Sequence, residues 1–234
     1  MNSIQKTARI TGLLILLMAF IAPFSMIYVP STLIVPGDAT ATAQQIVAAE
    51  GMFRLSMVSD AVVFLIEIGL CALLYVLLKP VSKTLSLVAA FARLAMTILQ
   101  GINLLNHFLV LLLLGGIGYL AVFTTEQLQA LALLFLNAHE TVVLIWGTAF
   151  ALHLLISGYL VCQSGYLPRW VGGLLMVAAL CYFIQSFGTL LLPQSKALFA
   201  SIGLLSMVEI ALPFWLLIKG VNLEAWKRRA FEAV

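Results

Sequence analysis

Six apolar stretches, each near the length needed to cross a lipid bilayer, determine what this chain can fold into. A membrane-spanning helix needs about 20 apolar residues, because it rises about 1.5 Å per residue. The chain has 234 residues, of which 63% are hydrophobic and 9% charged, whereas charged residues make up about a quarter of a typical soluble domain. We therefore expect an all-α, polytopic membrane protein. It should form a single domain over residues 1–234 with six transmembrane helices, at about 10–29, 53–78, 84–114, 138–162, 169–192 and 198–219.

The basic residues are divided unevenly between the two sets of predicted helix ends. One set carries Lys6, Arg9, Lys79, Lys83, Arg169, Lys219, Lys227, Arg228 and Arg229. The opposite set carries only Arg54 and Lys196. Lys and Arg are enriched in cytoplasmic loops, so we expect both termini to be cytoplasmic. Topology thus accounts for the net charge of +3, and we expect the lipid bilayer, not a nucleic acid, as the partner.

Polar side chains recur within three of these spans at intervals of seven residues. They are Asp60 and Glu67 in the second span, Arg93, Gln100 and His107 in the third, and His139, Trp146 and His153 in the fourth. Residues seven apart lie on the same face of a helix. A polar group in hydrocarbon needs a partner or a wet cavity, so we expect these faces to point into the protein.

Counting outward from the cytoplasmic turns KPVSK and QSGYLP places the polar residues at three depths. The inner layer is expected to hold Glu67, Arg93 and His153, joined by Glu209 of the sixth span. The middle layer is expected to hold Asp60, Gln100 and Trp146, joined by Tyr182, and the outer layer Arg54, His107 and His139.

The inner layer has the residue types of a proton relay. One arginine cannot neutralise two carboxylates, so we expect either Glu67 or Glu209 to carry a proton at neutral pH. His153 would exchange that proton and Arg93 would tune the group. The structural alternative is an ion pair between Arg93 and Glu67, with His153 hydrogen-bonded to Glu209, holding the bundle together.

The outer and middle layers allow other interpretations. His107 and His139 are ligand types suited to zinc or another divalent metal, although no HExxH spacing is present. His139 and His153, fourteen residues apart on one helix, also resemble the spacing of two haem ligands, but His107 could complete only the outer site. Trp146 with Tyr182 is typical of core packing, or of an aromatic face that holds a cation.

Several stretches of the chain resemble a known family. They are LIVPGDATATA, FRLSMVSDAVVFLIEIGLCALLYVLLKPVSKTLSLVAAFARL, LALLFLNAHE, HLLISGYLVCQSGYLPRWVGGLLMVAALCYFI and the ending WLLIKG. In this order they are similar to the bacterial integral-membrane family catalogued as domain of unknown function 4386, over nearly the whole chain. The matching positions are Asp60, Glu67, His139, His153 and Glu209. The resemblance implies a multi-pass protein of the bacterial inner (cytoplasmic) membrane, and the family brings no established activity.

Together these observations favour an integral membrane protein with an intramembrane polar cavity that binds a lipophilic or amphipathic small molecule and moves it in a proton-linked manner. Glu67, His153 and Glu209 would carry the proton, and the ligand would contact Asp60, Arg93, Gln100, Trp146 and Tyr182. The alternatives are an intramembrane enzyme using acid/base or metal-assisted chemistry on a lipid or isoprenoid, a haem-binding protein, and a passive assembly partner. The chain has no recognised catalytic motif that would decide whether it is an enzyme.

Overall fold

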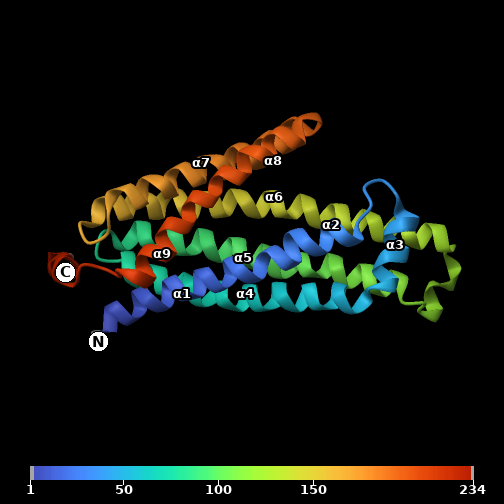
Figure 1. The fold of residues 1–234 in the computed structure, drawn as a ribbon, viewed down its shortest axis with the longest axis horizontal. Helices are drawn as coiled ribbons and strands as arrows, with labels where there is room; N and C mark the ends of the chain where they lie inside the picture. Colours follow the sequence, from blue (N-terminus) through green and yellow to red (C-terminus); the bar gives the residue numbers. More distant parts are fainter. Residues whose placement is uncertain (1–2, 233–234) are drawn as a thin grey trace. The chain divides into compact units, whose positions relative to one another are not determined.

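Helices make up almost all of the computed structural model, which describes residues 3–232 and has no strand among them (Figure 1). The α-helices are α1 (Ser3–Pro23), α2 (Val29–Leu33), α3 (Ala39–Ala48), α4 (Glu50–Leu78), α5 (Lys83–Leu114), α6 (Thr125–Ser164), α7 (Arg169–Leu191), α8 (Lys196–Leu204), α9 (Ala211–Ile218) and α10 (Leu223–Glu232).

Six segments of the described chain are long and apolar enough to cross a membrane, which confirms the predicted all-α membrane fold. They are Ser3–Leu33, Glu50–Leu78, Lys83–Leu114, Thr125–Ser164, Arg169–Leu191 and Pro193–Ile218. Most are longer than the predicted spans, because a helix does not end where its apolar stretch ends. The longest, α6, has 40 residues and is about 60 Å long at 1.5 Å per residue.

The first and last spans are interrupted helices. In the first span a π-helical turn, Phe24–Tyr28, follows α1 and leads into α2. Pro23 lacks a backbone N–H, which explains why the α-helical hydrogen bonding changes there. In the last span a 3₁₀ segment, Leu205–Ile210, separates α8 from α9. Such interruptions often mark functional hinges or sites.

The chain forms two compact units. The first unit contains residues 3–17, 66–98 and 144–232, and the second contains residues 18–65 and 99–143. Helices α4, α5 and α6 each contribute one segment to the first unit and one to the second. The single domain expected from the sequence stays a prediction.

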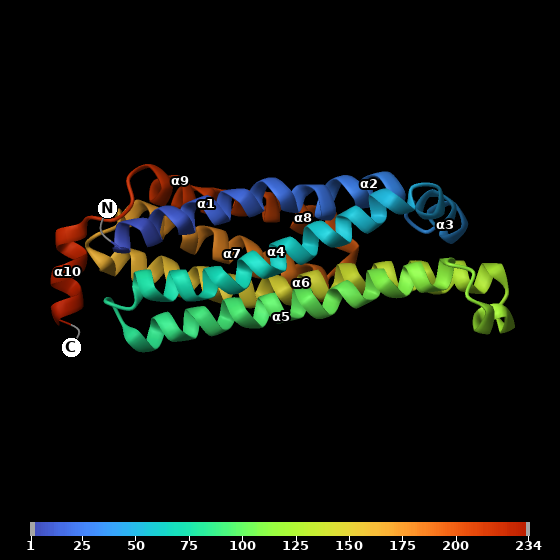
Figure 2. The ribbon, with the colours of Figure 1, turned by 90° about the horizontal axis from the view of Figure 1, so that it is seen from below.

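Close helix contacts in the first unit depend on glycine. A Cβ atom on Gly12 of α1 would lie 2.6 Å from the carbonyl oxygen of Pro213 in α9, and the two helices run side by side in Figures 1 and 2. Between α6 and α7 the contact is reciprocal. A Cβ on Gly158 would lie 2.7 Å from the Gly172 carbonyl oxygen, and a Cβ on Gly172 would lie 2.5 Å from that of Gly158. Any side chain at these positions would push the helices apart.

Both ends of the described chain lie at one end of the first unit, beside the turns that join α4 to α5 and α6 to α7 (Figure 2). The Tyr166 hydroxyl donates to the Leu77 carbonyl oxygen at 2.7 Å, and Trp226 Nε1 of α10 donates to the same oxygen at 3.2 Å. Gly165 ends α6 with a φ of +73°, the left-handed conformation that glycine adopts without strain. These bonds fasten the Tyr166 turn and α10 to the end of α4.

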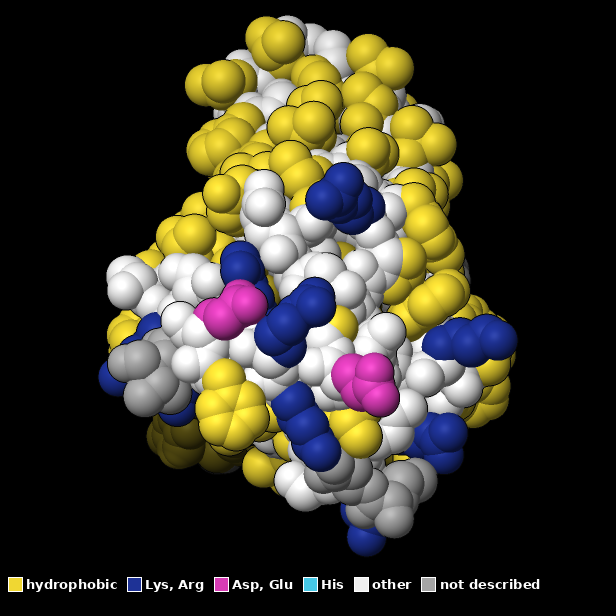
Figure 3. Space-filling model, turned by 90° about the vertical axis from the view of Figure 1, so that its left-hand side faces the viewer, with side chains coloured by type: hydrophobic (Ala, Val, Ile, Leu, Met, Phe, Trp, Pro, Cys, Tyr) yellow, Lys and Arg dark blue, Asp and Glu magenta, His cyan; other side chains and the backbone are white. Residues whose placement is uncertain are grey.

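Exposed Lys and Arg side chains gather on this same face (Figure 3). They include Lys6, Arg9, Lys79, Lys83, Arg169, Lys219, Lys227 and Arg228. The structure thus bears out the gathering of cations at one set of helix ends that the sequence predicts. The side of the membrane on which this face lies, and so the cytoplasmic location of the termini, stays a prediction.

The second unit contains the short helix α3. Asp38 caps it, because its carboxylate accepts a hydrogen bond from the Ala41 N–H at 2.9 Å. Ile46 of α3 is buried with Phe53, Val110 and other apolar residues in the core of this unit.

Candidate functional site

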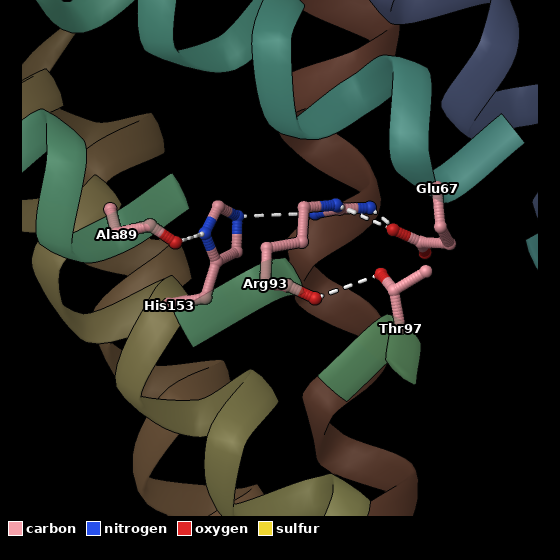
Figure 4. A network of polar contacts seen from close by, with 5 residues as sticks. All are labelled: Glu67, Ala89, Arg93, Thr97 and His153. Carbon is pink, nitrogen blue, oxygen red and sulfur yellow. Dashed lines mark hydrogen bonds and ion pairs between the residues drawn. The ribbon is translucent and has the colours of Figure 1, made fainter. Parts of the chain in front are cut away.

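A buried network of hydrogen bonds joins Glu67, Arg93 and His153 in the first unit (Figure 4). Arg93 donates to both carboxylate oxygens of Glu67, from Nε to Oε2 at 2.6 Å and from Nη2 to Oε1 at 3.0 Å. Its Nη1 lies 3.1 Å from Nε2 of His153. The three residues are 2–3% exposed, and they come from α4, α5 and α6. The structure therefore brings together the three residues that counting from the cytoplasmic turns places at one depth.

The partners of His153 determine its protonation state. A guanidinium nitrogen can only donate, so Nε2 of His153 must accept from Arg93. Nδ1 lies 2.9 Å from the Ala89 carbonyl oxygen, which can only accept, so Nδ1 carries the proton. His153 is thus a neutral imidazole with both nitrogens in use. Its second partner is Ala89, where the structural alternative predicted Glu209.

Glu209 lies in the first unit but has a different partner. Tyr182 of α7 donates its hydroxyl proton to Oε1 of Glu209 at 3.1 Å. No Lys, Arg or His side chain among the described residues forms an ion pair with Glu209. This carboxyl group is half-buried and belongs to the 3₁₀ segment of the last span. It is therefore the one acidic group of the predicted inner layer without a cationic partner.

Three aromatic rings of the first unit pack beside these groups. Trp146 and Phe150 of α6 stack with ring centroids 5.4 Å apart, and Tyr182 lies edge-on to them at 6.3 and 5.2 Å. Cζ of Arg93 lies 5.5 Å from the Phe150 centroid, within the range of a cation–π contact. Nε1 of Trp146 is buried with no hydrogen-bond acceptor in the described chain. The sequence interpretation missed Phe150, although its position four residues after Trp146 places it on the same face.

In the second unit, the buried carboxylate of Asp60 is bound to the first span. Ser25 donates its hydroxyl proton to Oδ1 of Asp60 at 2.5 Å. Ser25 lies in the π-helical turn after Pro23, which connects that interruption to a buried charge. Sequence reasoning missed Ser25, because a lone serine in an apolar span has no distinctive pattern. Gln100, predicted at the depth of Asp60, is half-buried.

The two outer histidines lie in contact in the second unit. Their rings stack with centroids 3.9 Å apart and planes 19° apart. Nδ1 of His139 lies 3.4 Å from the Asn103 carbonyl oxygen, and Nδ1 of His107 is buried without a partner in the described chain. Arg54, expected in the same layer, instead pairs with Glu50 at 2.6 Å in an exposed position.

The described side chains do not fit the expected metal or haem ligation well. Zinc sites use three or four protein ligands, and no group of three His, Cys, Asp or Glu side chains in residues 3–232 is placed to hold a metal. The rings of His107 and His139 are stacked with their planes 19° apart, whereas an imidazole nitrogen binds a metal in the plane of its own ring. His153 has no free lone pair to offer a haem iron. Metal binding at His107 and His139 stays a prediction.

Comparison with protein-family models finds one that matches most of the chain. The family model described as "Domain of unknown function (DUF4386)" matches residues 10–220. The chain belongs to the DUF4386 family. This confirms the resemblance seen in the sequence, and the matched region contains every site residue described above.

The chain is also similar to a curated protein of an archaeon. An uncharacterised protein of the archaeon Archaeoglobus fulgidus is 28% identical over 169 residues, which cover 72% of this chain and 85% of the relative. No solved structure matches the chain. The bacterial origin expected from the sequence stays a prediction.

Proposed function

We propose that this protein binds a lipophilic or amphipathic small molecule within the membrane and moves it in exchange for a proton carried by Glu209. The observation that carries the proposal is the charge balance of the first unit. Arg93 is engaged by both oxygens of Glu67, so these two charges cancel. The carboxylate of Glu209 is then left without a counter-charge, a costly arrangement in a membrane protein. Either a proton or a cation from outside the protein must neutralise it.

The proposal assigns the proton to Glu209 alone, whereas the sequence suggests that Glu67, His153 and Glu209 share it. Both oxygens of Glu67 and both nitrogens of His153 are already hydrogen-bonded. A proton arriving at His153 would have to displace Arg93 from Nε2. Glu67 and His153 therefore serve best as supports that hold Arg93 in place, and Glu209 serves as the group that gains and loses the proton.

The position of Glu209 in the last span supports a role in movement. It lies in the 3₁₀ segment between α8 and α9, four residues before Pro213. Transporters bind their substrates at interrupted membrane helices, because the freed backbone groups and altered side-chain directions form the site. An interrupted span also bends more readily than a continuous helix.

The enzymatic alternative is less well supported. Acid/base catalysis on a lipid or isoprenoid needs a second free acid or base near the reacting atoms. His153 was the candidate for that role, and its two nitrogens are occupied by Arg93 and Ala89. Transport also agrees with the predicted location, a multi-pass protein of the bacterial inner membrane.

Uptake into proteoliposomes tests the proposal. The probes are three lipophilic molecules of similar size and different charge: tetraphenylphosphonium, tetraphenylborate and triphenylphosphine oxide. With an imposed pH gradient, at least one probe should accumulate faster than in protein-free liposomes, and an internal pH dye should report matching proton movement. E209Q should abolish this gradient-driven uptake. E224Q, the same chemical change at an exposed position of α10, should leave it unchanged. Uptake equal to that of empty liposomes for all three probes, or uptake unaffected by E209Q, would refute the proposal.

A further inference from the structure

We infer that the ligand is a lipophilic organic cation, a quaternary ammonium or a protonated amine, held by the carboxylate of Glu209 against the aromatic rings of Trp146 and Tyr182. This inference rests on the proposed function and names the class of its ligand.

The first argument is the chemistry of the cluster. A carboxylate without a cationic partner stands beside three aromatic rings whose centroids lie 5.2–6.3 Å apart. Aromatic faces attract cations through their quadrupole, and aromatic sites with nearby negative charge recognise quaternary ammonium groups. An anion would be repelled by Glu209 and by the negative faces of the rings. The charge and the rings therefore select the same sign of ligand.

The second argument is that one cation already binds this cluster. The Arg93 guanidinium lies over the Phe150 ring at 5.5 Å, but its charge is neutralised by Glu67. Glu209 does not bind the guanidinium directly; it accepts a hydrogen bond from Tyr182 instead. A second cation at Tyr182 and Trp146 would give Glu209 an ion-pair partner of its own, as Arg93 is for Glu67.

The third argument is the unsatisfied donor. Nε1 of Trp146 is buried without an acceptor in the described chain, and an orphaned donor of this kind costs about 1–3 kcal/mol. A native protein rarely tolerates that cost without reason. A ligand that carries an oxygen near its cationic nitrogen would satisfy both Trp146 and Glu209.

The fourth argument concerns the route by which the ligand arrives. Trp146, Tyr182 and Glu209 are all half-buried, so each keeps part of its surface exposed. All three lie in membrane-spanning segments, where an exposed surface faces lipid or a cavity within the membrane. A ligand can therefore reach the cluster from within the bilayer, which favours a cation that dissolves in the bilayer over a water-soluble metal ion.

Equilibrium binding to the full-length protein in nanodiscs tests the inference, with empty nanodiscs subtracted. Tetraphenylphosphonium should bind saturably, and tetraphenylborate and triphenylphosphine oxide should not. Binding should tighten as the pH rises, because protons compete for Glu209. E209Q should weaken binding at least tenfold and remove the pH dependence, whereas E224Q should do neither.

Two tryptophan variants test the aromatic part of the site. W146L should weaken tetraphenylphosphonium binding about tenfold, the loss expected for one desolvated cation–π contact, and W146F should retain most of the affinity. W170L, which removes an exposed tryptophan of α7 elsewhere, should bind as the wild type. Thermal unfolding of each variant shows whether it is folded.

The outcomes separate the inference from the proposed function. If the neutral or anionic probe binds saturably and is taken up while the cation is not, the ligand class is wrong and the proposed function stands. If the cation binds equally well to wild type, E209Q and W146L, this site is not where it binds, and the inference fails. Failure of all three probes in the uptake assay refutes the proposed function itself.

Discussion

Replacing Arg93 with methionine should destabilise the protein strongly, because the change leaves the buried carboxylate of Glu67 without its partner. Breaking a buried ion pair from one side costs about 3–5 kcal/mol. The loss also orphans Nε2 of His153, which accepts from Arg93 at 3.1 Å. An unsatisfied buried acceptor costs about 1–3 kcal/mol. We therefore expect R93M to lower the free energy of unfolding by at least 3 kcal/mol.

The double variant E67M/R93M isolates the pair itself. It removes both charges and leaves only the His153 nitrogen unsatisfied, so it should cost about 1–3 kcal/mol. E67M alone leaves Arg93 buried and unpaired, and should resemble R93M. The double-mutant cycle of wild type, R93M, E67M and E67M/R93M then gives a coupling energy above about 2 kcal/mol. Interhelical hydrogen bonds in a membrane protein average about 0.6 and reach about 1.7 kcal/mol, so a coupling above that range identifies a bidentate buried ion pair.

The measurement is reversible unfolding in mixed micelles of rising dodecyl sulfate content, followed by circular dichroism. The pair of Glu50 and Arg54 is the matched control, since it has the same charges and the same 2.6 Å contact, with side chains 49% and 60% exposed. Its coupling should be about 0.3–0.5 kcal/mol. A coupling between Glu67 and Arg93 no larger than that of the control would refute the geometry on which the proposed function rests.

Three further changes test other parts of the structure. G172A should destabilise the protein by about 1–3 kcal/mol, because its Cβ would lie 2.5 Å from the Gly158 oxygen; the neighbouring G173A meets no atom within 4 Å and should be neutral or slightly stabilising, as micelle unfolding would show. S25A should cost about 1–3 kcal/mol by removing the donor to Asp60, and S25T, which keeps a hydroxyl, should cost less. Burial raises the pKa of Tyr166 above its usual value of about 10. As the pH rises past that value, the hydroxyl loses its proton in the unfolded protein before it does so in the folded protein, so the free energy of unfolding should fall. The fall should be smaller in Y166F, which has no hydroxyl to titrate.

The spacing of polar residues predicts much of the candidate site, because two simple rules apply to straight helices. Residues seven apart share a face, and residues equally far from a tight turn share a depth. These rules suffice to bring Glu67, Arg93 and His153 together, and to bring His107 near His139. They do not identify the partner atoms. Arg93 binds His153 at Nε2 and Ala89 binds it at Nδ1, and the second partner is a backbone carbonyl, which no residue pattern reveals.

Interrupted helices limit what counting along a sequence can predict. Counting places Glu209 at the depth of the inner layer, but the direction of its side chain follows from such counting only in a continuous α-helix, in which each residue turns by about 100°. The segment Leu205–Ile210 is a 3₁₀ helix of six residues, in which each residue turns by about 120°. Over six residues the difference is about 120°, a third of a full turn, which is enough to move a side chain to another face of the helix. The carboxyl group of Glu209 accepts a hydrogen bond from Tyr182 of α7, where the structural alternative paired it with His153 of α6. A departure from α-helical geometry within a span thus limits what counting can say about the partner of a side chain, because counting fixes its depth and leaves its direction open.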